Sequence, residues 1–331
     1  MEDQWFHKIF KVTEPGFQQL ALEIFRFQYQ HNPIYKAYVD MLNIRPGEVA
    51  TLSQVPFLPI QFFKTHPVKT TEFEPAVVFE SSGTTQGGNS HHFVKDIECY
   101  KESFLKGFEL FYGPVKELCI IGLLPSYLER KNSSLVFMVD ELIRLSQHPK
   151  SGFYLSDHHK LSATLNELES AKQKTLLVGV SFALLDFTEK YPMSLANTIV
   201  METGGMKGRK EEMVRSELHD ILKKNFGLQV IHSEYGMTEL LSQAYSRSNG
   251  IFHCPPWMKV LMRDEEDPLH IRQPVEGIGC RGGINIIDLA NIYSCSFIAT
   301  DDAGKLYHDG SFEVLGRLDN SDIRGCSLMA L

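Results

Sequence analysis

A segment rich in hydroxyl groups and glycines occupies residues 80–92, with the sequence Glu80-Ser-Ser-Gly-Thr-Thr-Gln-Gly-Gly-Asn-Ser-His-His92. Glycines let the backbone approach a ligand closely and expose its N–H groups, and the hydroxyls add further donors. Such a loop suits a polyanion, above all the phosphate chain of a nucleotide. The Gly-Lys-Ser/Thr ending of a Walker loop is absent, and a flexible Ser/Gly surface loop is the alternative interpretation.

Aromatic, hydroxyl and acidic groups follow one another in the segment Ser233-Glu-Tyr-Gly-Met-Thr-Glu239. The ring of Tyr235 can stack on a base, the hydroxyl of Thr238 can bond a phosphate, and the carboxylate of Glu239 can hold Mg²⁺. A polar turn accounts for the same segment equally well. Its chemistry therefore depends on which other groups lie beside it.

Three more clusters offer contacts to a nucleotide. In Thr300-Asp-Asp-Ala-Gly304 a carboxylate can accept both hydroxyls of a ribose, although Asp and Gly more commonly form a hairpin turn. In the segment 316–325, Arg317 can reach phosphate or ribose, and exposed ion pairs are the alternative. The glycines of Glu202-Thr-Gly-Gly-Met-Lys-Gly-Arg209 allow flat contact with a planar ring, and an ordinary strand–helix turn explains them as well.

Apolar runs and amphipathic segments alternate before residue 231 and must position these clusters. We expect helices over 17–30, 97–111, 134–146 and 209–225, with Asp96 and Ser133 as caps of the second and third. We expect strands over 76–80, 118–122, 175–180, 198–202 and 228–231. This alternation indicates an α/β fold with a mainly parallel, doubly wound sheet. Ligands on such sheets lie at the carboxyl ends of the strands, so the loops after 80, 202 and 231 should form the site.

The pattern changes after about residue 250. Strand-like runs over 284–288, 295–300, 305–308 and 312–315 are separated by short Gly/Asp turns and indicate a smaller antiparallel or barrel-like part. The proline-spaced segment 55–63 is expected to pack irregularly, as neither strand nor helix. The expected division is a helical and irregular part over 1–75, an α/β part over 76–250 and a β-rich part over 251–318.

The composition narrows the class of protein. The 331 residues suffice for a large core, and the net charge of −8 gives no general attraction to nucleic acid or anionic membranes. No signal peptide or transmembrane-length run is visible. The six cysteines contain no CxxC pair, so free thiols are expected. These features predict a soluble cytoplasmic protein that binds no nucleic acid and is not integral to a membrane.

The order of the clusters resembles that of the adenylate-forming enzymes, the acyl-CoA synthetase and luciferase superfamily. Ser81-Ser-Gly-Thr-Thr85, Tyr235-Gly-Met-Thr-Glu239, Thr300-Asp301 and Gly316-Arg-Leu-Asp319 follow one another as in that superfamily, within residues 80–325. The resemblance implies the large-domain fold of the superfamily, with doubly wound, mainly parallel sheets and a smaller barrel-like β subdomain. It also implies ATP and Mg²⁺ as cofactors and a small carboxylic acid as substrate.

The resemblance further assigns a role to each matching position. The loop 81–85 would surround the ATP phosphates, Asp301 would bind the ribose, and Arg317 would contact the nucleotide. Thr238 and Glu239 would handle phosphate and Mg²⁺, with Glu239 as the metal ligand. Asp319 would lie at a hinge. The nucleotide pocket as a whole would be lined by Ser81, Ser82, Gly83, Thr84, Thr85, Gly204, Gly205, Tyr235, Gly236 and Asp301.

Two departures separate this chain from most of that superfamily. Gly88 and Asn89 stand where the phosphate loop usually continues to Pro-Lys, and His91 and His92 can supply donors instead. Only twelve residues follow Asp319, where the superfamily has a mobile domain that carries the adenylation lysine and shapes the coenzyme A tunnel. We expect that domain to be absent and residues 319–331 to form a residual hinge and tail.

One branch of the superfamily fits a short chain better. The sequence resembles the acyl-protein synthetase (LuxE-type) family, whose members activate a fatty acid as acyl-AMP and then form a thioester on a cysteine near their C-terminus. Cys326 stands at the corresponding place, Arg324 nearby favours a thiolate, and an incidental cysteine is the alternative. The segments 56–64 and 288–295 (Pro-Phe-Leu-Pro-Ile-Gln-Phe-Phe-Lys and Asp-Leu-Ala-Asn-Ile-Tyr-Ser-Cys) also resemble that family.

Together these features predict ATP-dependent activation of a carboxylic acid, a fatty acid by the resemblance, with transfer of the acyl group to Cys326 and then to an acceptor. Positioning and charge neutralisation by Thr238, Glu239 and Arg317 would carry the catalysis. The acceptor would be a partner protein or coenzyme A. Two alternatives stay open: an adenylating enzyme that loads coenzyme A or a carrier without a Cys326 intermediate, and a nucleotide-binding protein without catalysis.

Overall fold

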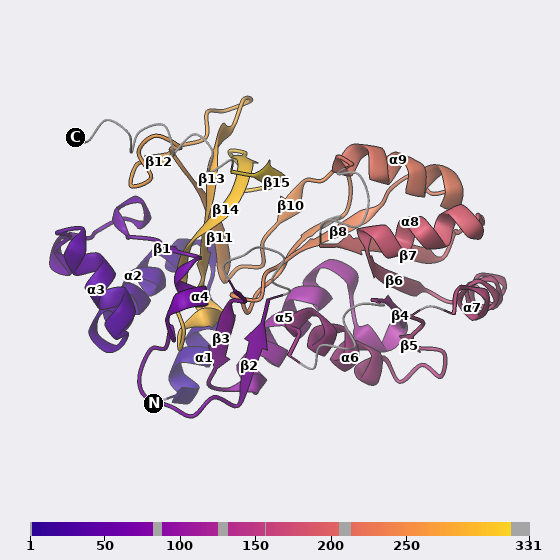
Figure 1. Ribbon diagram of the computed structural model, residues 1–331, viewed down its shortest axis with the longest axis horizontal. Helices are drawn as coiled ribbons and strands as arrows, with labels where there is room; N and C mark the ends of the chain where they lie inside the picture. Colours follow the sequence, from indigo (N-terminus) through magenta and orange to yellow (C-terminus); the bar gives the residue numbers. More distant parts are fainter. Residues whose placement is uncertain (1, 82–87, 125–131, 156, 205–212, 319–331) are drawn as a thin grey trace.

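The computed structural model describes residues 2–81, 88–124, 132–155, 157–204 and 213–318. The described strands form one long mixed sheet and a separate two-stranded sheet. In Figure 1, an N-terminal helical group lies to the left, antiparallel strands stand in the middle, and parallel strands with their helices lie to the right.

The N-terminal group contains helices and short turns. Its elements are α1 (Glu2–Phe10), α2 (Glu14–His31), α3 (Pro33–Met41), η1 (Pro46–Glu48), η2 (Leu52–Gln54), β1 (Leu58–Pro59) and α4 (Phe62–Thr65). The helix α2 confirms the prediction over 17–30 and buries Phe17, Ile24 and Phe25. The expectation of irregular structure over 55–63 is wrong in part, because β1 adds to the sheet in parallel and α4 begins at Phe62. The proline is tolerated there because β1 is a short edge strand.

The parallel part has the strand order β8-β7-β6-β4-β5. Its strands are β4 (Cys119–Leu123), β5 (Gly152–Phe153), β6 (Thr175–Val180), β7 (Thr198–Thr203) and β8 (His232–Tyr235). Every residue of β4 and β6 is buried, as expected for strands covered on both faces. The predictions over 118–122, 175–180 and 198–202 are thus confirmed.

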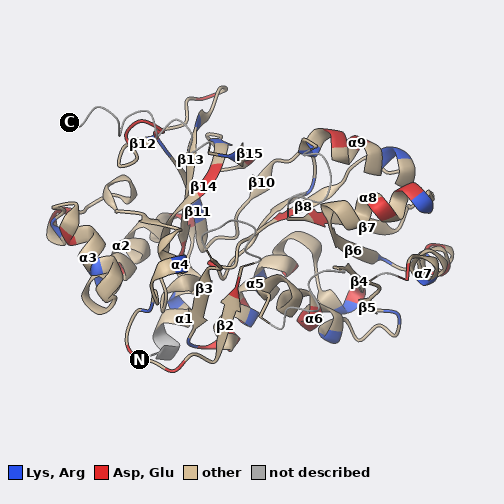
Figure 2. Ribbon diagram, viewed as in Figure 1, with Lys and Arg blue, Asp and Glu red and all other residues tan. Residues whose placement is uncertain are grey.

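Helices cover both faces of these strands. They are α5 (Ile97–Tyr112), α6 (Ser134–Ser146), α7 (His158–Ser170), α8 (Ser181–Lys190) and α9 (Arg215–Phe226), with the turn η3 (Val115–Glu117). In Figure 1, α5 and α6 lie below the strands and α8 and α9 above them, which is the doubly wound arrangement. In Figure 2, acidic and basic residues follow one another along α8 and α9. On α9, Lys223 and Asp220 form an ion pair at 3.0 Å.

The caps and ends of these helices follow local chemistry. Asp96 accepts from the N–H of Glu98 at 2.9 Å and Ser133 from that of Val136 at 3.4 Å, as the sequence predicts. The helix expected from 209 begins at Arg215 within the described residues. The strand expected over 228–231 is wrong, because the chain joins the sheet only at β8. After Gly227 ends α9 in the left-handed conformation (φ +64°), the buried side chain of Ile231 packs without ladder bonds.

The strand expected over 76–80 is confirmed as β2 (Val77–Glu80), but its expected place in the parallel sheet is wrong. It pairs antiparallel with β3 (His91–Val94) in a separate two-stranded sheet. The N–H of Ser81 donates to the carbonyl of Ser90 at 3.1 Å, and the N–H of Ser90 donates to Oγ of Ser81 at 2.8 Å. The hydroxyl-rich loop is therefore anchored at both ends by a hairpin rather than leading from a strand into a helix.

The antiparallel strands continue the long sheet in the order β12-β11-β13-β14-β15-β10-β9-β8. They are β9 (Ala244–Ser246), β10 (Phe252–His253), β11 (Met258–Arg263), β12 (Ile271–Arg272), β13 (Cys280–Asp288), β14 (Phe297–Leu306) and β15 (Phe312–Arg317), with the turn η4 (Leu289–Asn291). The two strands expected over 295–300 and 305–308 are one strand, because Ala303 and Gly304 pair with both β13 and β15. The hairpin-turn interpretation of residues 300–304 is therefore wrong.

The sheet curls strongly where the two parts meet. Tyr235 on β8 donates a hydrogen bond of 2.8 Å to Asp302 on β14, although β9, β10 and β15 lie between these strands in sheet order. Four strand spacings of a flat sheet would span about 19 Å. The strands must therefore bend around the stacked rings of Phe252 and Phe312, whose centroids lie 5.4 Å apart. This curvature agrees with the barrel-like part expected from the sequence.

The described cysteines are free thiols, as their spacing predicts: Cys99, Cys119, Cys254, Cys280 and Cys295. Within the same described residues, no helix combines the length and the apolar character needed to cross a bilayer.

Candidate functional site

Tyr235 ends β8 inside an aromatic cluster. Its ring centroid lies 5.8 Å from that of Phe252 and 5.6 Å from that of Phe312, and the residue is 8% exposed. Burial, with the charge of Asp302, raises the pKa of Tyr235 well above its ordinary value. The phenol is therefore protonated and donates to Oδ2 of Asp302. These contacts hold the ring in one orientation. The stacking of Tyr235 on a base stays a prediction.

Two acids on β14 meet the arginine of β15. Nη1 of Arg317 lies 3.6 Å from Oδ2 of Asp301, and Nε lies 3.4 Å from Oδ1 of Asp302. Asp301 also accepts from Nε2 of Gln61, so the N-terminal group reaches the site. The structure thus brings Asp301 and Arg317 together as the sequence expects. The sequence reasoning missed Asp302, whose only signal is its place in the Asp-Asp pair.

His92 and Asn291 contact the backbone of the segment that carries Thr238 and Glu239. Nδ1 of His92 lies 2.8 Å from the carbonyl of Thr238, and Nδ2 of Asn291 donates to the carbonyl of Glu239 at 2.7 Å. Nε2 of His92 lies 2.9 Å from Oδ1 of Asn291. Burial lowers the pKa of His92 to about 4. The expectation that His92 supplies donors to a ligand is wrong, since it is 1% exposed and both ring nitrogens face protein atoms.

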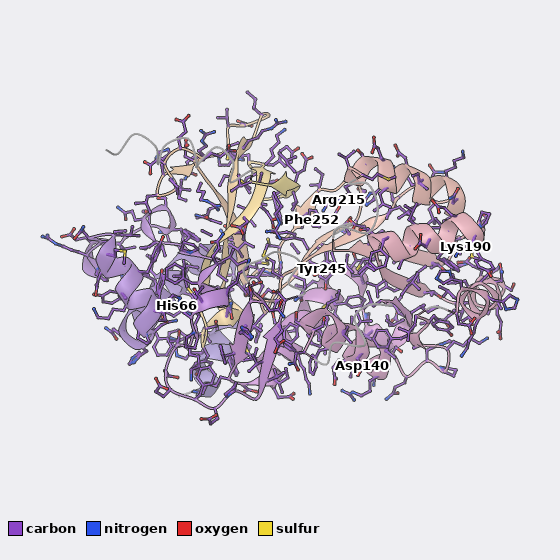
Figure 3. The ribbon with its side chains drawn as sticks, in the orientation of Figure 1. His66, Asp140, Lys190, Arg215, Tyr245 and Phe252 are labelled. Carbon is purple, nitrogen blue, oxygen red and sulfur yellow. The ribbon has the colours of Figure 1, made fainter. Side chains whose placement is uncertain are left out.

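Glu202 lies buried near the carboxyl end of β7. Its Oε1 accepts from Nε of Arg215 at 3.0 Å, and its Oε2 accepts from Oγ of Ser181 at 3.2 Å. Burial alone would raise the pKa of Glu202, but His219 and Arg215 bring it below its usual value. The guanidinium of Arg215 also lies 5.2 Å from the ring centroid of Phe252, and Figure 3 shows the two residues beside each other. The ion pair thus joins the helix α9 to β7, and the cation–π contact joins it to β10.

A second buried carboxylate, Glu234, lies on the neighbouring strand. Thr203 Oγ1 donates to its Oε2. Burial raises the pKa of Glu234 to about 7, which the bond from Thr203 opposes and the charge of Glu202 supports. A Cβ on Gly236 would overlap Oε1 of Glu234, so a larger residue there would have to displace the end of that side chain. Sequence reasoning gave Glu234 no catalytic role, although an acid inside a short strand is itself a signal.

The remaining expected residues are only partly described. Gly204 is exposed, has φ +69°, and its carbonyl accepts from Oγ of Ser181 at 2.9 Å. Ser81 begins the hydroxyl-rich loop, as described above. The expectations for Ser82, Gly83, Thr84, Thr85, Gly205, Asp319 and Cys326 lie outside the described residues.

The geometry supports a nucleotide site more than a protein-only metal site. Among the described residues, no three His, Cys, Asp or Glu side chains are placed to hold a metal ion together. Mg²⁺ in nucleotide sites is held by one or two carboxylates plus substrate phosphates, which a single acid such as Glu239 can satisfy. The end of β8 contacts β14 through Tyr235 and Asp302, and β14 contacts β15 through Asp302 and Arg317. The backbone of the segment that carries this acid contacts His92 of the hairpin β2–β3 and Asn291.

This architecture is that of the large domain of adenylate-forming enzymes. ATP-bound MatB from Rhodopseudomonas palustris matches with a TM-score of 0.55 at 16% identity, over 72% of this chain and 47% of that chain. O-succinylbenzoate coenzyme A synthetase (MenE) from Bacillus subtilis, in complex with ATP and magnesium ion, matches with a TM-score of 0.52 at 16% identity, over 74% and 51%. A luciferase-like enzyme from the mealworm Zophobas morio matches with a TM-score of 0.51 at 16% identity, over 75% and 59%. This chain thus spans about half the length of the first two structures.

The family model for the acyl-protein synthetase LuxE matches residues 6–330. The chain belongs to this acyl-protein synthetase family. A search of the curated proteins finds no match. The fold class that the order of the sequence clusters predicts is therefore confirmed. The family that the position of Cys326 and the segments 56–64 and 288–295 predict is confirmed as well.

Proposed function

We propose that this protein activates a carboxylic acid with ATP and then transfers the acyl group. The observation that carries the proposal is the convergence of Tyr235, Asp302 and Arg317. The segment of Thr238 and Glu239 follows Tyr235 directly in the chain, and His92 of β3 contacts its backbone. These groups come from segments far apart in the sequence of an acyl-protein synthetase family member. The free thiols of the described residues suit a reducing, cytoplasmic setting.

In the proposed first step, an oxygen of the acid attacks the α-phosphorus of ATP. The bond from that phosphorus to the bridging oxygen breaks, and pyrophosphate leaves with the electron pair. Arg317, whose side chain is 69% exposed, would meet the phosphates, and Asp301 and Asp302 the ribose. The loop 81–85 would supply donors to the phosphates, and Gly204, Gly205, Tyr235 and Gly236 would line the base. Bound Mg²⁺, held by Glu239, would neutralise phosphate charge.

In the proposed second step, the thiolate of Cys326 attacks the acyl carbonyl. The bond to AMP breaks, AMP leaves, and a thioester remains that can pass to a partner protein or to coenzyme A. By its family, the chain would take a fatty acid. A protein that loads coenzyme A or a carrier directly from the adenylate is the second candidate, since the chain shares its fold with coenzyme A synthetases.

Acid-dependent exchange of labelled pyrophosphate into ATP tests the first step. With a panel of straight-chain and aromatic acids, we expect exchange with at least one of them. The variant Arg317→Ala should lose about 10- to 100-fold in rate, because a charge-assisted contact is lost. The matched control is Arg272→Ala, an exposed arginine on β12. Absence of exchange with every acid would reject adenylation and leave the nucleotide-binding alternative.

Intact-mass spectrometry tests the second step. We expect an acyl adduct with ATP and the acid, and none in Cys326→Ser, which should keep pyrophosphate exchange. A Cys326→Ser protein that transfers acyl groups at the full rate would instead favour direct loading of the acceptor.

A further inference from the structure

A cavity of about 620 Å³ lies between the N-terminal helical group and the antiparallel strands. Its walls come from α3, the segment 43–61, β11, β14 and the chain around β12. Apolar side chains provide much of the lining, among them Ile44, Val49, Phe57, Leu269 and Ile271. Asp301 also lines the cavity. The apolar lining residues have no role in the proposed reaction.

A buried arginine lines this cavity. Arg263, at the end of β11, is 9% exposed. Its Nη1 donates to the carbonyl of Ile284 and to Oδ1 of Asn285, both at 2.8 Å, and its Nη2 donates to the carbonyl of Thr300. A guanidinium has five N–H donors. Among the described residues, these three bonds leave Nε–H and one Nη2–H without an acceptor.

This guanidinium makes no direct ion pair with a described residue, and the charges of Asp301 and Asp302 act on it only from a greater distance. Among the described residues, no carboxylate oxygen lies within 4.0 Å of it, whereas Asp301 in the same cavity accepts from Gln61 and faces Arg317. Arg45, at the rim, is paired with Glu48 at 3.1 Å. Buried charges in proteins are normally paired, because an uncompensated buried charge is costly. Among the described residues, the cavity therefore offers a cation without a direct ion-pair partner, which an incoming anion can contact.

Gly283 shapes the space around this cation. A Cβ at that position would lie 2.6 Å from Cζ of Arg263, 2.8 Å from Nε and 2.9 Å from Nη2. Because Cζ would be the nearest atom, the guanidinium turns its flat face, not its edge, to Gly283. The glycine thus admits the guanidinium, which a side chain at that position would displace. The Nε and Nη2 edge of a guanidinium matches the two oxygens of a carboxylate.

We propose that this cavity binds an organic monocarboxylate, with its carboxylate on the Nε and Nη2 edge of Arg263 and its apolar body against the aliphatic walls. The charged lining residues are two arginines and two acids, Arg45, Arg263, Glu48 and Asp301, so a single negative charge suits the site better than a dianion. Binding needs no nucleotide. The inference goes beyond the proposed reaction and is tested without ATP.

The reporter for the test is Leu269→Trp, because Leu269 lines the cavity and is 51% exposed. Titration of its fluorescence with sodium hexanoate should saturate. In the same background, Arg263→Met should weaken hexanoate binding at least about tenfold, because two charge-assisted hydrogen bonds are lost. Arg272→Met, an exposed arginine paired with Asp264 outside the cavity, should leave it unchanged. Hexanol and inorganic phosphate should bind at least about tenfold more weakly than hexanoate.

Arg263→Lys guards against an Arg263→Met protein that fails to fold. It keeps the charge but not the planar edge, and it should also bind hexanoate at least about tenfold more weakly. The proposal is overturned if hexanoate gives no saturable change, if hexanol binds equally well in the reporter protein, or if a folded Arg263 variant keeps full affinity. It is also overturned if phosphate binds through Arg263 as tightly as hexanoate.

Discussion

At the residue scale, His92 supports the candidate site without facing a ligand. The carbonyl of Thr238 can only accept, so Nδ1 of His92 carries the hydrogen of their 2.8 Å bond. Replacing the ring with a methyl group would leave that carbonyl without its donor. The ring is therefore a link between the hairpin β2–β3 and the segment of Glu239.

We expect His92→Ala to lower the free energy of unfolding by about 1–3 kcal/mol, the usual effect of leaving buried polar groups unsatisfied. Urea denaturation followed by circular dichroism measures this loss. His91→Ala is the matched control, because His91 is the neighbouring, less buried residue of β3. Equal losses in the two variants would contradict the linking role of His92.

Glu234 gives the protein a dependence on pH. Its pKa is raised to about 7 in the folded state by burial, from an ordinary 4.5, so the folded state holds the proton more tightly between these values. The stability from protonated Glu234 is therefore present below pH 4.5 and lost as the pH rises through 7. Sequence alone cannot give this value, because it arises from burial beside Thr203 and Glu202.

Glu234→Gln should remove this loss, since an amide does not ionise. The free energy of unfolding of the variant, relative to the natural protein, should rise between pH 5 and pH 8 by up to about 3 kcal/mol. Paired urea titrations at the two pH values measure it. His92 titrates in both proteins and cancels in the difference. A difference that does not change with pH would show that Glu234 is ionised at both values.

At the element scale, β14 is central to the sheet and has a register shift at its middle. The shift lies between Ala303 and Gly304 in the ladder with β15. A Cβ on Gly304 would lie 2.7 Å from the carbonyl oxygen of Glu313 and 2.7 Å from the side chain of Ile284. The glycine thus allows a close backbone approach next to Asp301 and Asp302.

Gly304→Ala should lower the free energy of unfolding by about 1–3 kcal/mol, because the methyl group must displace backbone. Thermal or urea unfolding gives the value. Gly152→Ala on the edge strand β5 is the control, since no atom lies within 4 Å of the added methyl there. An equally small loss of stability at both positions would mean that β14 can accommodate the methyl group by a small backbone shift.

The elements set by local patterns could be predicted from the sequence. The apolar runs that became β4, β6 and β7 and the caps Asp96 and Ser133 depend only on neighbouring residues. The pairing of β2 with β3 and the joining of 295–300 with 305–308 depend on partners distant in sequence or in space. The run 228–231 was misassigned because buried apolar residues need not pair in a sheet.

The residues of the candidate site also fall into those that the sequence predicts and those that it does not. Tyr235, Asp301 and Arg317 could be found because motif order predicts them, and the structure places them together. Asp302, Asn291 and Arg263 could not, because their importance lies in contacts with β8, Glu239 and an internal cavity. No local pattern encodes such contacts.

At the scale of the whole molecule, the N-terminal group is fixed to the antiparallel strands by buried amides. Nε2 of Gln28 donates to the carbonyls of Asn291 and Ile292 and to Oγ of Ser296, and its Oε1 accepts from the N–H of Ser296 at 3.0 Å. Nδ2 of Asn32 donates to the carbonyl of Ser294 at 3.0 Å. These bonds join residues more than 260 positions apart in the sequence.

Gln28→Ala should therefore destabilise the whole chain by at least about 2 kcal/mol, since several buried groups lose their partner at once. Calorimetry should show one unfolding transition in the natural protein and a lower midpoint in the variant. Gln19→Ala on the exposed face of the same helix is the control. Two separate transitions in the natural protein would contradict the joining of the parts.

The curled sheet has one narrow connection. β10 and β15 pair through a single residue pair, Phe252 with Phe312, whereas β6 and β7 pair through six. The strand that carries Tyr235 and the strand that carries Arg317 are thus joined across that place by little backbone bonding. We expect fast amide hydrogen exchange there and slow exchange in β6 and β7. A bound nucleotide that contacts both strands should hold them together where β10 and β15 pair. It should therefore slow the hydrogen exchange there.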